Sequence, residues 1–104
     1  MNNIVALYDR LGIPLNLLGR DELGRAWYDT PDLAIWRQLE LVKFLKRNFN
    51  LIMTSNGIGI SSGDNYVECK HNSFAYSLLG AIEAGLHFFT EKQKEELKQI
   101  LTKR

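Results

Sequence analysis

Apolar positions near the start of the chain recur at helical spacing. One face carries residues at intervals of three and four: Ile4, Leu7, Tyr8 and Leu11. Gly12 follows as a residue suited to the left-handed conformation that ends many helices, and Pro14 prevents the helix from continuing. The pattern predicts a helix over residues 2–11.

Residues 13–30 show no clear period. Gly19, Gly24 and the polar run at 20–22 predict a structured loop with at most one short helical turn. Its apolar side chains indicate that it packs against the rest of the protein: Leu15, Leu17, Leu18, Leu23, Trp27 and Tyr28. A connection of this length is often functional.

A second helix is predicted over residues 31–48. Thr30 is a capping residue, Pro31 suits the first helical position, and Asp32 lies near the positive end of the helix dipole. Lys46 and Arg47 fall in the last turn, where cations are favoured.

The period then changes to that of strands. Residues 51–54, 58–60 and 66–70 are β-prone, and Asn56-Gly57 is a strong hairpin signal between the first two. The last strand alternates, with Val67 and Cys69 on one face and Tyr66, Glu68 and Lys70 on the other. These runs predict a three-stranded antiparallel meander.

Two more helices complete the chain. Asn72 or Ser73 caps a helix over 73–88, and Glu83 is its single charged residue, so we expect it to be the central buried helix. A capping box at 90–93 opens a helix over 91–103 with a narrow apolar stripe: Leu97, Ile100 and Leu101. The predicted fold is α+β, a small three-stranded antiparallel meander packed with about four helices, in a single domain over residues 1–104.

Composition narrows the class of protein. Thirteen Lys and Arg against twelve Asp and Glu give a formal net charge of +1, without the positive excess of a dedicated nucleic-acid binder. The single cysteine excludes an intramolecular disulfide and fits a reducing compartment. The first residues lack the apolar run of a signal peptide, and no window approaches the ~20 apolar residues of a membrane span. We therefore expect a cytoplasmic protein.

The sequence offers little catalytic chemistry. Cys69 has one nearby base, His71, although a small core residue is the favoured interpretation of this cysteine. Glu83 and His87 share a helix face, but a metal site needs three or four converging ligands. We predict no catalytic residue, no metal and no cofactor.

The most informative positions lie on the helix over 31–48. An arc of roughly 60° on this helix holds four side chains: Trp36, Glu40, Lys43 and Arg47. An indole on a charged stripe is unusual, and Trp and Arg are enriched at binding hot spots. The alternative is that residues 13–30 fold over the helix, so that Trp27, Tyr28 and Trp36 form a small cluster.

We predict a small, non-catalytic interaction protein that binds another protein and regulates or inhibits it by docking or occlusion. The binding surface would combine this helix face with residues 13–30: Trp36, Glu40, Lys43, Arg47, Arg20, Arg25 and Trp27. One alternative is a nucleic-acid-associated regulator with a basic patch drawn from Arg20, Arg25, Arg37, Lys43, Lys46 and Arg47. Another is a small thiol enzyme using Cys69 and His71. A homodimer through the helices over 73–88 or 91–103 is also open.

Overall fold

The computed structural model describes residues 3–29, 33–55 and 57–103. Its elements follow one another as α1 (Asn3–Arg10), β1 (Leu17–Arg20), β2 (Ala26–Tyr28), α2 (Ile35–Asn48), β3 (Asn50–Thr54), β4 (Gly57–Ser62), β5 (Asn65–Cys69), α3 (Phe74–Gly85), a short 3-10 helix η1 (Leu86–Phe88) and α4 (Glu91–Thr102). The α+β class, the four helices and the three-stranded meander are confirmed.

The meander has β4 at its centre, with β3 and β5 antiparallel on either side. Ile58 is opposite Met53 and Cys69, and Ile60 is opposite Leu51 and Val67. These six residues therefore share one face of the sheet. As predicted, Val67 and Cys69 contact the core, whereas Tyr66 and Glu68 are exposed.

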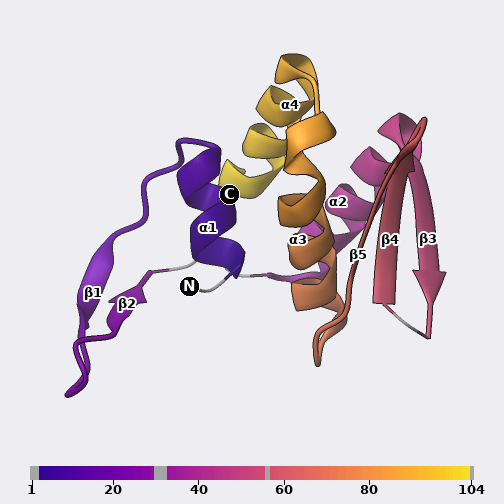
Figure 1. Ribbon diagram of the computed structural model, residues 1–104. Helices are drawn as coiled ribbons and strands as arrows, with labels where there is room; N and C mark the ends of the chain where they lie inside the picture. Colours follow the sequence, from indigo (N-terminus) through magenta and orange to yellow (C-terminus); the bar gives the residue numbers. More distant parts are fainter. Residues whose placement is uncertain (1–2, 30–32, 56, 104) are drawn as a thin grey trace.

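All four helices lie on that one face of the sheet (Figure 1). α3 packs against β4 and β5, α2 lies beside β3, α1 packs on α3, and α4 packs on α2. Phe44 of α2 is fully buried and contacts the rings of Phe49 and Phe89. α3 is the central buried helix that its sequence predicts.

Among the described residues no helix lies over the other face of the sheet, and a side chain of the sheet covers its middle. A Cβ at Gly59 would lie 2.5 Å from the hydroxyl oxygen of Tyr66. The ring of Tyr66 therefore lies on β4 itself, in space that Gly59 leaves open. Tyr66 in turn donates a 2.7 Å hydrogen bond to Glu68.

Three predicted helix ends are confirmed. Gly12 has a φ of 73°, and the Ile13 N–H donates a 2.8 Å bond back to the Tyr8 carbonyl, as in a Schellman motif. The Ser73 hydroxyl caps α3, and the Thr90 capping box opens α4.

The predicted beginning of the second helix is wrong. Thr30, Pro31 and Asp32 lie outside the described residues, and α2 begins at Ile35 after an extended Ala34. The Ala34 carbonyl accepts the first helical bonds, from the N–H groups of residues 37 and 38, and no side chain of the described residues caps this end. The proline and capping signals thus lie before the helix begins, rather than in its first turn.

The predicted loop over 13–30 is also corrected, because it contains an antiparallel hairpin of β1 and β2. Leu17 pairs with Tyr28 and Arg20 pairs with Ala26, with an irregularity in register between them. Strands of four and three residues, interrupted in this way, are too short to display an alternating pattern in the sequence.

The expectation that this segment packs closely is wrong for most of it. Leu15 contacts the core and Tyr28 is half-buried, but Leu17, Leu18, Leu23 and Trp27 are exposed. The hairpin projects from the helices at the end of the molecule away from the meander (Figure 1). This arm extends the longest dimension to 44 Å, against 29 and 25 Å for the other two.

Candidate functional site

The exposed side of α2 is divided into two halves of different chemistry. Leu41, Phe44 and Leu45 turn inward to the core. The outward side, which we call the α2 face, consists of Ile35, Trp36, Leu39, Lys43, Lys46 and Arg47. Its first half is apolar and its second half is basic. Glu40 of the predicted stripe lies half-buried on the same helix.

The structure decides between the two interpretations of Trp36. The indole is 42% exposed, and Trp27 lies on the hairpin, which is separate from α2 (Figure 1). The predicted cluster of Trp27, Tyr28 and Trp36 under a folded-over loop is therefore wrong. Exposed Ile35 and Leu39 enlarge the apolar half, and sequence reasoning missed them because they lie on a flank of the charged stripe.

Trp36 rests on a buried cation. The guanidinium carbon of Arg37 lies 4.5 Å from the centroid of the indole, within range of a cation–π interaction. Arg37 itself is only 6% exposed and donates bonds to the carbonyls of Ile100 at 2.6 Å and Lys103 at 2.8 Å. Its place in a basic surface patch is therefore a wrong prediction, because this cation binds the carboxyl end of α4.

The basic half is partly neutralised. Arg47 forms an ion pair with Glu96 of α4, which ties the end of α2 to the neighbouring helix. Lys43 and Lys46 are exposed, and no acidic side chain in the described part of the chain pairs with either. On the α2 face, these two ammonium groups can therefore form ion pairs with acidic groups of a ligand.

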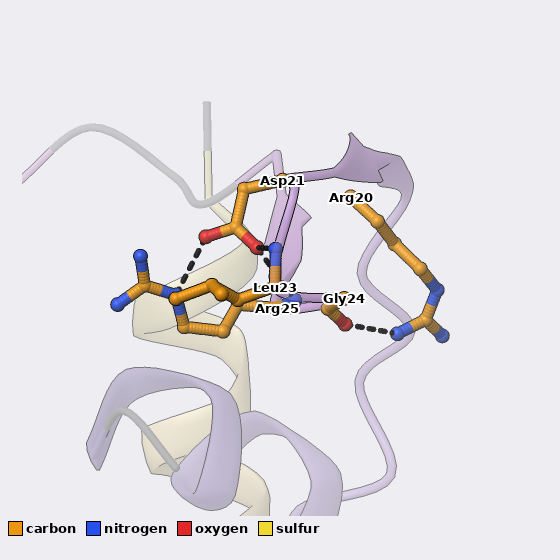
Figure 2. A network of polar contacts seen from close by, with 5 residues as sticks. All are labelled: Arg20, Asp21, Leu23, Gly24 and Arg25. Atoms are coloured by element: carbon orange, nitrogen blue, oxygen red, sulfur yellow. Dashed lines mark hydrogen bonds and ion pairs between the residues drawn. The ribbon is translucent and has the colours of Figure 1, made fainter.

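Trp27, Arg20 and Arg25 lie together on the hairpin rather than with α2 (Figures 1 and 2). Asp21 closes the turn by accepting bonds from the N–H groups of Leu23 and Arg25 and from the Arg25 side chain. The Arg25 N–H is the main cause that lowers the pKa of Asp21. Arg20 donates to the Gly24 carbonyl at 3.0 Å.

The seven predicted binding residues therefore form two surfaces, one on α2 and one on the hairpin. The basic residues at 20 and 25 support the hairpin turn, whereas those at 43, 46 and 47 lie on α2, which is separate from the hairpin (Figure 1). They do not join into the single basic patch that the nucleic-acid alternative needs.

The cysteine is placed as a core residue. Cys69 packs half-buried against the core on the inner face of β5. Burial, and secondarily the negative charge of Glu83, raises the pKa of its thiol. A raised pKa leaves the thiol protonated at neutral pH, which opposes its use as a nucleophile. His71 is exposed, and its backbone N–H donates to the Ser77 hydroxyl at 2.8 Å.

The residues considered for metal binding have other partners. Glu83 accepts a 3.1 Å bond from Arg10, and His87 Nδ1 lies 3.0 Å from the Ala84 carbonyl. Within residues 3–29, 33–55 and 57–103, no three His, Cys, Asp or Glu side chains gather closely enough to hold a metal ion.

An open hollow of about 550 Å³ lies where the approach to β1 passes the end of α4. Tyr8 and Arg37 are its buried polar residues, and both contribute bonds to backbone carbonyls of α4. Burial raises the pKa of Tyr8 to about 12, although the positive charge of Arg37 acts in the opposite direction. The polar groups of this hollow thus serve the structure of the α4 terminus.

The raised pKa of Tyr8 predicts a loss of stability in alkali. Between pH 10 and 12 the unfolded chain releases the phenol proton while the folded protein keeps it, so rising pH favours unfolding. Relative to Tyr8→Phe, the wild type should lose up to roughly 2 kcal/mol of unfolding free energy across this window. Urea titrations at pH 8 to 12 measure it, with the exposed Tyr76→Phe as control. Parallel curves for wild type and Tyr8→Phe would contradict the prediction.

No helix in the described ranges combines the length and the apolar character needed to cross a membrane. We compared the chain with protein families, with curated proteins and with solved structures, and none of the three comparisons found a match.

Proposed function

We propose that this protein is a non-catalytic binding domain that recognises another protein through the α2 face and regulates it by occupying its surface. The observation that carries the proposal is Trp36, an exposed indole stacked on the buried Arg37 and flanked by exposed Ile35 and Leu39. The hairpin, with Trp27 exposed, supplies a second apolar surface for the same role.

The contact between the Trp36 indole and the buried Arg37 favours tight binding of a partner. An aromatic side chain that is fixed before binding loses little conformational entropy when a partner covers it. Arg37 is anchored by the carbonyls of Ile100 in α4 and Lys103 directly after it, so the surface on which the indole rests is part of the folded core. Tryptophan in such a setting is a typical hot-spot residue.

The chemistry of the α2 face defines the partner. Ile35, Trp36 and Leu39 fit an apolar groove or an apolar helix face on the other protein. Lys43 and Lys46 lie one to two helical turns further on, where carboxylates of the partner would orient it. We therefore propose a partner with an apolar patch bordered by acidic residues.

Replacing Trp36 by alanine tests the proposal. The indole is half-exposed, so we expect the free energy of unfolding to fall by no more than about 1 kcal/mol. Affinity for the partner should fall by about 2 kcal/mol, close to a thirtyfold rise in Kd. The measurement is quantitative affinity capture from native lysate with wild-type and variant baits, followed by calorimetry on the purified partner.

Tyr76→Ala is the matched control, because Tyr76 is an aromatic residue of similar exposure at the start of α3. The expected result is a protein retained by the wild type and by Tyr76→Ala but lost by Trp36→Ala. If every protein captured by the wild type is also captured by Trp36→Ala, the α2 face is not the binding surface.

The ionic strength dependence of binding separates a protein partner from a nucleic acid. An interface of three apolar residues and two lysines should weaken only modestly with salt. Phosphate contacts would instead give a steep linear fall in log affinity with log salt, and the bound material would be sensitive to nuclease. A steep slope would replace the proposal with the nucleic-acid alternative.

A further inference from the structure

The two outer strands of the meander are protected to different degrees. β5 carries Glu68 and is followed directly by Lys70, both exposed. β3 reads Asn-Leu-Ile-Met-Thr and contains neither a charged residue nor a proline. Natural proteins usually place charges or proline on an exposed strand edge, because an unpaired backbone attracts another strand.

The edge of β3 is open to solvent. Ile52 is 39% exposed and Met53 is 53% exposed. In the part of the chain that the structure describes, residues 50–53 form backbone hydrogen bonds to β4 and to nothing else. Figure 1 shows β3 at the end of the molecule with no element beyond it. An uncharged apolar edge with free backbone groups is a site for strand addition.

The sequence of β3 is symmetric in its chemistry about Ile52. One apolar residue lies on each side of Ile52, and one polar residue lies at each end: Leu51 and Met53, then Asn50 and Thr54. We propose that β3 pairs antiparallel with β3 of a second copy of this chain, with Ile52 opposite Ile52 on the two-fold axis. Leu51 then faces Met53 and Asn50 faces Thr54 across the interface.

This register satisfies the backbone as well as the side chains. In an antiparallel edge strand, alternate residues direct their N–H and C=O groups outward. When two copies pair with Ile52 opposite Ile52, odd-numbered residues lie opposite odd-numbered ones and even opposite even. The residues whose backbone groups point outward therefore face the same residues of the second copy, whichever of the two sets they form. The product is one continuous six-stranded sheet with all helices of both copies on the same face, which is an isologous contact.

The chemistry of the edge favours a second copy over a strand of a different protein. A strand without charge has no means of selecting an oppositely charged partner, whereas its two-fold pattern matches its own sequence. Five residues bury less than the ≈800 Å² per partner of a standard interface. The dimer is therefore weak, with a Kd in the micromolar range, and forms at high local concentration.

The β3 contact is separate from the proposed function. It uses backbone groups of the sheet edge and needs neither Trp36 nor Lys43. Trp36→Ala should leave the monomer–dimer equilibrium unchanged, so failure of one proposal does not entail failure of the other.

Ile52→Lys tests the inference because it places two ammonium groups side by side on the two-fold axis. Asn65→Lys, on the opposite edge strand β5, adds the same charge at an exposed position and is the control. Sedimentation velocity of the full chain across a concentration series should show a monomer–dimer equilibrium for the wild type and for Asn65→Lys. Ile52→Lys should raise the dissociation constant at least tenfold.

Cross-linking provides a second measurement that does not depend on tolerance of the lysine. Opposed residues of an antiparallel pair have Cα atoms roughly 4.5–5.5 Å apart, within the span of a disulfide. Ile52→Cys should form a disulfide-linked dimer on mild oxidation, whereas Asn65→Cys should not. A wild type that stays monomeric at every concentration, a dimer unaffected by Ile52→Lys, or equal cross-linking of the two cysteine variants would each overturn the proposal.

Discussion

Arg37→Ala should unfold at a much lower denaturant concentration than the wild type, with a loss of about 3 kcal/mol of unfolding free energy. Arg37 donates two charge-assisted bonds to the carbonyls of Ile100 and Lys103. Each such bond contributes roughly 1.5–3 kcal/mol, and alanine leaves both acceptors without it. The Arg37 side chain is almost fully buried, and water entering from the neighbouring hollow would replace its two bonds only in part. Equilibrium urea unfolding followed by circular dichroism measures the loss.

Two variants give this experiment its controls. Lys43→Ala removes an exposed cation from the same helix and should change stability by less than about 0.5 kcal/mol. Arg37→Lys keeps the charge but cannot span both carbonyls with a planar fork, so it should recover only part of the loss. If Arg37→Ala is as stable as Lys43→Ala, the link between α2 and the end of α4 contributes nothing.

The same variant connects stability with binding. Without Arg37 the Trp36 indole loses the cation on which it rests and gains freedom. Arg37→Ala should therefore weaken partner binding even under conditions where the protein remains folded. Because binding is compared under conditions in which the variant remains folded, this separates a positioning role from a purely structural one.

Gly57→Ala should cost about 3 kcal/mol of unfolding free energy. Gly57 has a φ of 119°, which L side chains rarely adopt, and such backbone strain costs 1–3 kcal/mol. A Cβ there would also overlap the backbone carbonyl oxygen of Cys69, at the point where β4 meets the end of β5. Backbone cannot move aside as a flexible side chain can, so the two strands would have to separate. Thermal and urea denaturation measure the change.

Gly63→Ala separates these two causes. Gly63 lies in the other turn of the meander with a φ of 60°, and a Cβ there would meet nothing within 4 Å. Only the left-handed conformation is penalised, by about 1 kcal/mol. Equal losses for the two variants would mean that the close approach to Cys69 has no energetic consequence.

The parts of the fold that the sequence predicts are those set by local periodicity and by capping. The stripe from Ile4 to Leu11, the cap at Ser73 and the capping box at Thr90 each involve residues within a few positions of one another. Helical geometry likewise places Trp36 about 180° from the buried Leu45, on the outer side of α2, but whether residues 13–30 cover it depends on the tertiary structure.

The rest depends on contacts between distant parts of the chain. Arg37 appears as one more surface cation until the end of α4, more than sixty residues later, is brought against it. Ile35 and Leu39 are residue types typical of a core, yet they are exposed because no helix or strand of the described residues covers that side of α2. The hairpin escapes detection because its strands are short and irregular. The grouping of the predicted binding residues into two surfaces likewise follows from tertiary structure alone.

The projecting hairpin has a further consequence for how this protein can diverge. The chain enters the arm at Asn16 and leaves it at Asp29, and these two residues are joined by a 2.8 Å backbone hydrogen bond. The body of the domain therefore meets the same two anchor points whatever lies between them. Insertions, deletions and exchanges of residues within the arm can accumulate without disturbing the interior. The sequence of the arm can thus change in evolution while the scaffold retains its stability.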